Sequence, residues 1–114
     1  MAAFSDVKGD FPRNIGGSEY LGRYAVSLAG HDTGKIYLVV GVVCKGPAAA
    51  PQAFLLADGR SRKASAPKLK KRMHVCVLKS GDEQLAAALA EGGGVTDAQL
   101  VHSLRCFKAQ STLC

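Results

Sequence analysis

The 114-residue sequence contains no tryptophan and few other aromatic residues, namely three tyrosines and four phenylalanines. Proteins that bind single-stranded nucleic acids by stacking need aromatic rings on their surface. The tyrosines of this chain flank a pair of β-prone segments, where strand positions place them mainly in the core; they are Tyr20, Tyr24 and Tyr37. The sequence therefore gives little support to a function that depends on stacking against bases.

Motifs that mark common enzymes are also missing. The sequence shows no nucleophile elbow, no phosphate-binding loop, no paired carboxylates at a useful spacing and no metal-binding cluster. The glycine run at residues 92–94 is followed by Val95 rather than by the lysine and hydroxyl residue of a phosphate loop, so a flexible joint explains it. We expect no enzyme activity, no catalytic residues and no cofactor.

The cysteines form no Cys-x-x-Cys pair; they are Cys44, Cys76, Cys106 and Cys114. This spacing supports neither a zinc ribbon nor a thioredoxin-type motif. Buried or half-buried free thiols in a reducing compartment are the simpler interpretation. His74 and Cys76 could share one face of a strand, but two ligands without a third do not make a zinc site. We therefore expect no bound metal.

Long apolar runs are absent as well. The longest spans residues 36–44, nine residues, whereas a membrane helix needs about 20. Polar and charged residues interrupt the first ten positions, so no basic region followed by an apolar block is present there. We expect a soluble, cytoplasmic protein without a membrane segment, in which residues 1–19 form an irregular leader.

Positive charge is concentrated in one segment. Lysine and arginine total 15 against nine acidic residues, which gives a net charge of +6. Residues 60–72 hold seven basic residues and no acidic one, which leaves eight basic against nine acidic residues elsewhere. A near-neutral body with one cationic segment is typical of a protein that binds a polyanion, because each phosphate contact releases condensed counterions. A solvated loop that only aids solubility is the alternative.

Hydrophobic patterning predicts several short strands between residues 20 and 79. Residues 23–30 alternate like a half-buried strand, and residues 36–43 are apolar at nearly every position, which predicts a central strand covered on both faces. Between them, Gly30 and Gly34 enclose a polar turn around Asp32, as in a hairpin. About five strands closed into a small SH3-like barrel would leave no exposed sheet edge.

The later strands are predicted from shorter signals. Residues 46–51 contain two prolines and are expected to form a surface loop. Residues 53–57 read as a strand, Asp58-Gly59 as a two-residue hairpin turn, and residues 60–64 as the returning partner strand. The basic residues 68–72 would then lie on a loop that leads into the last strand at residues 73–78.

The pattern becomes helical after residue 79. Asp82 can cap a helix that ends at the glycine run, and Thr96 with Gln99 makes a capping box for another. Both predicted helices are short, so each needs a surface to pack on. We expect a mainly β fold, with the barrel at residues 20–79 and one or two short C-terminal helices within residues 80–114.

The hairpin carries a family resemblance. Gly22-Arg23, a strand, the segment Gly30-His31-Asp32-Thr33-Gly34-Lys35 and a second strand resemble a KOW motif. The Asp58-Gly59 turn and the basic run then follow in the order seen in the archaeal and eukaryotic large-subunit ribosomal protein family fourteen and its small bacterial relatives. The resemblance covers residues 21–77, apart from a Pro/Ala insert at residues 45–52. It implies an RNA-binding protein of translation, ribosomal or ribosome-associated, that contacts ribosomal RNA of the large subunit.

The residues expected to contact RNA are mainly the basic ones, because alternate strand positions point the same way and can track a phosphate backbone. The resemblance to KOW proteins adds the hairpin tip. The full set is His31, Lys35, Arg60, Arg62, Lys63, Lys68, Lys70, Lys71 and Arg72. The alternative is a non-enzymatic protein-interaction module, in which the basic run binds an acidic partner and a helix face formed by Leu100, Leu104 and Phe107 contacts it.

Overall fold

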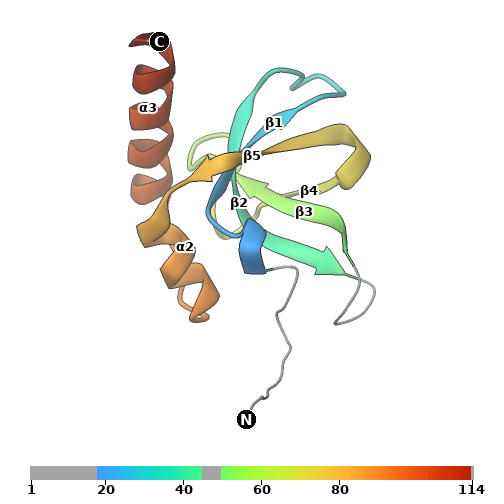
Figure 1. Ribbon diagram of the computed structural model, residues 1–114, viewed down its shortest axis with the longest axis horizontal. Coiled ribbons are helices and arrows are strands. Elements are labelled where there is room, and N and C mark those ends of the chain that lie inside the picture. Colours follow the sequence, from blue (N-terminus) through green and yellow to red (C-terminus); the bar gives the residue numbers. More distant parts are fainter. Residues whose placement is uncertain (1–17, 45–49, 114) are drawn as a thin grey trace.

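Five antiparallel strands and two helices make up most of the computed structural model, which describes residues 18–44 and 50–113. The strands are β1 (Arg23–Ser27), β2 (Ile36–Cys44), β3 (Pro51–Ala57), β4 (Lys68–Lys71) and β5 (Val75–Gly81). Two single turns of 3-10 helix, η2 (Ser18–Tyr20) and η3 (Arg72–His74), precede β1 and β5, and helices α2 (Glu83–Ala90) and α3 (Asp97–Leu113) follow. The mainly β fold with C-terminal helices is as expected (Figure 1).

The β1–β2 hairpin forms where the alternation and the turn residues predict it. Tyr24 pairs with Leu38 in an antiparallel register, and both turn glycines have positive φ, +90° at Gly30 and +89° at Gly34. The expected central position of β2 is confirmed by the strand order β4-β3-β2-β1-β5. β1 is not half-buried as expected, because Ala25 on its second face is fully buried as well.

Two separate hydrophobic clusters explain why both faces of these strands are covered. One cluster lies between the sheet and the helices and contains Tyr24, Leu38, Leu85, Leu100 and Leu104. The other fills the concave side of the rolled sheet and includes Ala25, Tyr37, Val39, Phe54 and Leu56. Burial on both faces of a short strand requires such a layer on each side.

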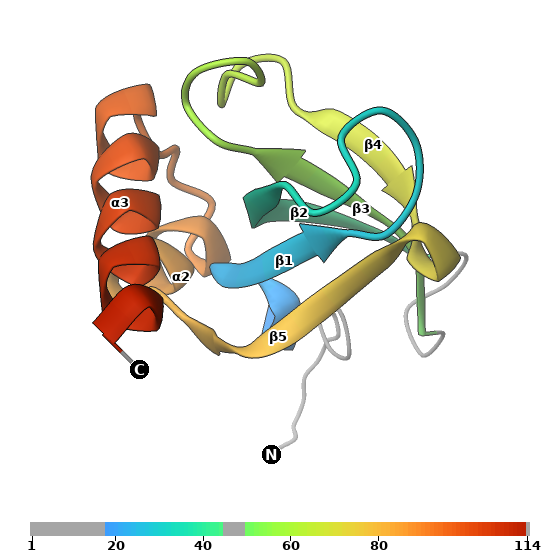
Figure 2. The ribbon, with the colours of Figure 1, turned by 90° about the horizontal axis from the view of Figure 1, so that it is seen from above.

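The sheet is rolled but not closed into the expected barrel. β4 and β5 are its two edges, and no ladder joins them among the described residues. The η3 turn connects them at one end of the sheet (Figure 2). The N–H of Leu28, just after β1, donates to the carbonyl of His74 in this turn at 2.9 Å. Because residues 72–74 form this turn, the last strand begins at Val75 rather than at residue 73.

The connection after β3 differs most from the prediction. Residues 58–67 form a long loop in place of a two-residue turn, and the partner strand is β4 rather than residues 60–64. The Asp58 carboxylate accepts from the backbone N–H groups of Arg60 and Arg62, at 2.9 and 2.8 Å. The carbonyl of Arg62 in turn accepts from the N–H groups of Asp58 and Gly59. These backbone groups are satisfied inside the loop, so they do not join a ladder.

Both helices begin at the predicted caps. The Asp82 side chain accepts from the N–H groups of Gln84 and Leu85, and Thr96 and Gln99 exchange the two hydrogen bonds of a capping box, at 2.8 and 3.1 Å. α3 has 17 residues and is not short. It continues to Leu113, well beyond the predicted core position Phe107.

The helix face that was expected to be available to a partner packs on the sheet instead. Leu100 and Leu104 are buried against Tyr24, and the Phe107 ring stacks on the Tyr24 ring with centroids 4.1 Å apart. The Tyr24 hydroxyl lies 2.9 Å from Ser103 Oγ. The core positions expected for the tyrosines are therefore confirmed at Tyr24 and also at Tyr37.

Other expectations concern the termini and the thiols. Residues 1–17 of the expected irregular leader and residues 45–49 of the Pro/Ala insert lie outside the described residues. The last two leader residues, Ser18 and Glu19, belong to η2, and Pro51 begins β3 rather than ending a loop. Cys44 is half-buried as expected, whereas Cys76 and Cys106 are exposed. No helix within residues 18–44 and 50–113 is long and apolar enough to cross a membrane.

Candidate nucleic-acid interface

Asp32 at the tip of the β1–β2 hairpin is the centre of a polar cluster. Its Oδ1 accepts from Ser27 Oγ and from Lys70 Nζ, each at 2.8 Å. Its Oδ2 accepts from the Tyr37 hydroxyl at 2.7 Å and from Lys68 Nζ at 2.9 Å. Asp32 therefore does more than shape the turn, which was the role expected for it: it ties the hairpin tip to β4.

The cluster shifts the pKa values of the Asp32 carboxyl and the Tyr37 hydroxyl in opposite directions. The Lys70 ammonium holds the pKa of Asp32 far below its usual range, and the hydrogen bonds from Lys68, Tyr37 and Ser27 outweigh the opposing effect of burial. Burial raises the pKa of Tyr37, and the neighbouring Asp32 carboxylate raises it further. Asp32 is thus ionised at neutral pH and neutralises lysines of β4.

Two of the predicted RNA contacts are occupied in this cluster. Lys70 is 8% exposed, and its ammonium also donates to the carbonyl of Ala29 at 2.7 Å. The Lys68 side chain is partly exposed and paired with Asp32. The expected alternation along β4 is present, but it points Lys68 and Lys70 toward Asp32 and leaves Lys71 outside. We assign Lys70 a structural role.

A second acid, Asp58, holds the loop of residues 58–67 against the start of β2. The Lys35 ammonium lies 3.0 Å from Asp58 Oδ2 and also donates to Ser61 Oγ. Burial alone would raise the pKa of Asp58, but the N–H groups of Arg62 and Arg60, together with Lys35 and Ser61, hold it well below its usual range. Lys35 is therefore a positioning residue for this loop as well as a partly exposed cation.

The same loop is attached to the first turns of α3. Gly59 has φ +80°, and a methyl group in place of its hydrogen would overlap the carbonyl oxygen of Asp97. The N–H of Ala64 donates to Asp97 Oδ1 at 2.8 Å. The loop is thus held by Asp58 from within and by Asp97 from α3, although 33 residues separate Ala64 from Asp97 in the chain.

The remaining predicted cations are exposed and fall into two groups. Arg60, Arg62 and Lys63 project from the loop of residues 58–67, whereas Lys71 ends β4 and Arg72 begins the η3 turn. His31 is exposed at the hairpin tip. The structure therefore places most of the sequence-predicted set on the surface, but it does not bring the set into one continuous row.

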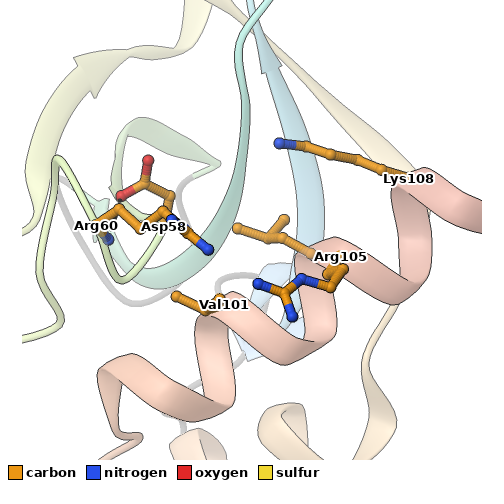
Figure 3. Close-up of a pocket in the computed structure, with 6 residues that line it drawn as sticks. Asp58, Arg60, Val101, Arg105 and Lys108 are labelled. Carbon is orange, nitrogen blue, oxygen red and sulfur yellow. Dashed lines mark hydrogen bonds between the residues drawn. The ribbon is translucent and has the colours of Figure 1, made fainter.

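A recess next to the first group includes residues that sequence reasoning missed. It has a volume of about 240 Å³ and is lined by Asp58, Arg60, Val101, Leu104, Arg105 and Lys108. Figure 3 shows Arg105 and Lys108 extending from α3 and Asp58 and Arg60 lying on the loop. In the sequence, Arg105 follows the core residue Leu104 and Lys108 follows the core residue Phe107, so both cations lie at the border of the buried face of α3. This adjacency is the sequence signal that could have pointed to them.

Searches for similarity and for metal sites give two further findings. Neither the scan against protein-family models nor the search of curated proteins gave a match to this chain. Within the part of the chain that the structure describes, no group of three or more His, Cys, Asp or Glu side chains is placed to hold a metal ion.

Proposed function

We propose that this protein binds the phosphate backbone of a structured RNA through the exposed cations of residues 58–72. The observation that carries the proposal is the loop of residues 58–67, which presents Arg60, Arg62 and Lys63 to solvent while Asp58 and Asp97 hold its backbone. A loop that is already ordered loses little conformational entropy on binding, so more of its electrostatic attraction contributes to affinity.

The acids around this surface do not cancel its charge. Asp32 is neutralised by Lys68 and Lys70, and Asp58 pairs with Lys35 and with backbone donors. The exposed cations of the loop are therefore left to attract phosphates. Few exposed aromatic rings accompany them, since Tyr24 and Tyr37 are buried, which favours recognition of backbone and shape over readout of bases.

The resemblance of the hairpin to a KOW motif supports ribosomal RNA as the specific partner. On this proposal the protein works in the cytoplasm as a ribosomal or ribosome-associated component of translation, without catalysis. A sucrose gradient of cell lysate, run with and without ribonuclease, tests it. Co-migration with the large ribosomal subunit at moderate salt would support the proposal, and a position at the top of every gradient would contradict the ribosomal assignment.

The direct test is a charge reversal in the full chain. Arg62→Glu should weaken binding to a structured ribosomal RNA fragment, measured by fluorescence anisotropy over a series of salt concentrations, because it places an anion among the loop cations. Lys79→Glu is the matched control, since Lys79 is exposed on β5 at the other edge of the sheet (Figure 2). Equal affinities of the two variants would argue against the loop as the binding surface.

A second candidate function is a protein-interaction module with an acidic partner. It is favoured by the exposure of two large apolar side chains, Leu69 at 61% and Met73 at 74%, beside the cations Lys71 and Arg72. An amphipathic acidic segment would match this mixture of apolar and positive groups. If excess RNA fails to displace a partner protein captured from lysate, the protein-interaction function gains over RNA binding.

A further inference from the structure

The recess between α3 and the loop of residues 58–67 combines positive charge with an apolar floor. Arg60 approaches it from the loop, Arg105 and Lys108 approach it from α3, and Val101 and Leu104 form apolar parts of its lining (Figure 3). Its volume is about 240 Å³. A phosphate group with its attached sugar atoms fits in such a space.

The guanidinium groups in this lining are available for a ligand. The ion pairs among the described residues engage Lys35, Lys68 and Lys70, and none of them engages Arg60 or Arg105. Arginine presents its N–H donors in a planar fork that matches two oxygens of a phosphate. The apolar side chains of the floor strengthen such contacts, because they lower the local dielectric.

One acid, Asp58, also lines the recess, but it is satisfied from other directions. Its Oδ1 accepts from two backbone N–H groups and its Oδ2 accepts from Ser61 Oγ and Lys35 Nζ. Because Lys35 compensates the charge of Asp58, the guanidinium groups of Arg60 and Arg105 leave the recess with net positive charge. It is suited to an anion rather than to a cation or a neutral ligand.

We propose that this recess binds one phosphodiester group of the RNA backbone, with Arg60 and Arg105 donating to its oxygens from opposite walls. The inference rests on the proposed RNA binding, and it extends the interface from the basic segment onto α3. It explains why a cationic loop is fixed to this helix: the Gly59 and Ala64 contacts with Asp97 set the separation of the two walls.

The test compares single substitutions in the full chain. Arg105→Ala should lower RNA affinity about tenfold, the loss of one charge-assisted contact. It should also make the slope of log affinity against log salt less steep by about 0.9. Because a backbone contact carries no base information, the loss should be the same for structured RNAs of unrelated sequence. Lys79→Ala removes one exposed charge on β5 and should change neither quantity.

A second variant and a second ligand keep the test decisive. Arg60→Ala removes the opposite wall and should reproduce the effect, which covers the case in which Arg105→Ala disturbs α3. If wild type binds RNA and both variants bind like the Lys79→Ala control, the recess is not a phosphate site, although the proposed function stands. If wild type binds no RNA, the proposed function and this inference both fall. A heteronuclear NMR titration with adenosine monophosphate, followed at the backbone amides of Arg60 and Arg105, tests the other source of a phosphate. If the nucleotide binds there as tightly as RNA does, a free nucleotide is the ligand and the proposal of an RNA phosphodiester is wrong.

Discussion

Lys70 donates from its ammonium to Asp32 Oδ1 at 2.8 Å, across 38 residues of sequence. Both side chains are largely buried, 9% and 12% exposed. The pair joins the tip of the β1–β2 hairpin to the edge strand β4. Without Lys70, the largely buried Asp32 carboxylate would keep only the more exposed ammonium of Lys68 among the two lysines that it pairs with. Breaking a buried ion pair costs more than the pair itself contributes, because the remaining charge is less well compensated.

Lys70→Met is therefore expected to lower the free energy of unfolding by about 3 kcal/mol. Urea denaturation followed by circular dichroism measures the change. Lys71→Met is the matched control, because Lys71 is the next residue of β4 and points to solvent; its effect should stay within about 0.5 kcal/mol. Similar unfolding midpoints for the two variants would show that the Lys70 contact is not structural.

The stability of the protein should fall in acid. Asp32 and Asp58 have pKa values below the ordinary value of 3.8 in the folded protein. As pH decreases, the unfolded chain takes up these protons first, so the free energy of unfolding declines from about pH 5 downward. Asp32→Asn should be less stable than wild type at pH 7 and should lose less on acidification. Denaturation curves at pH 7, 4 and 3 test this, and parallel losses in both proteins would contradict it.

Gly59→Ala should both destabilise the protein and loosen the basic loop. The substitution forces a side chain into φ +80° and against the Asp97 carbonyl. Gly34→Ala measures the cost of the positive φ by itself. Gly34 has φ +89°, and apart from its chain neighbours no described atom lies within 4 Å of the added methyl group. Gly34→Ala should cost about 1 kcal/mol and Gly59→Ala at least about twice that. If thermal denaturation shows equal losses of stability for the two variants, the loop can move away from α3 to accommodate the methyl group without added strain.

The hydrogen bond between the Tyr24 hydroxyl and Ser103 anchors α3 to the sheet. Tyr24→Phe keeps the ring stacked on Phe107 but leaves the buried Ser103 hydroxyl without this partner. We expect a loss of about 1 kcal/mol in the free energy of unfolding, together with faster hydrogen exchange of the α3 amides. Unchanged exchange rates would indicate that apolar packing holds the helix without this hydrogen bond.

The features that the sequence predicted correctly depend on neighbours in the chain. The β1–β2 hairpin follows from alternation around Gly30 and Gly34, and the helix starts follow from Asp82 and Thr96, each of which bonds to groups at most three residues away. The central place of β2 follows from its continuous apolar character. Local chemistry decides each of these elements, so no knowledge of the rest of the fold is required.

The errors concern contacts between distant segments. The Asp58 side chain accepts hydrogen bonds from the backbone N–H groups of Arg60 and Arg62, so these residues form a loop and the partner strand begins only at Lys68. The Asp-Gly pair in the sequence does not reveal this. Lys70 lies inside because Asp32 is there to receive it. The sequence of β4 alone does not show that its lysines at alternate positions point inward, because their acidic partner, Asp32, lies far away in the chain. Arg105 likewise becomes a candidate only when the structure shows that α3 lies beside the loop of residues 58–67.

The position of β4 at an edge of the sheet gives its outward charges a second effect. An edge strand offers unpaired backbone groups to the strand of another copy, and the exposed Leu69 would favour such self-association. Lys71 and the adjacent Arg72 oppose it, because two copies approaching along this edge bring like charges together. The cations proposed to attract RNA would thus also oppose edge-to-edge association of two copies, and a bound polyanion would remove that repulsion.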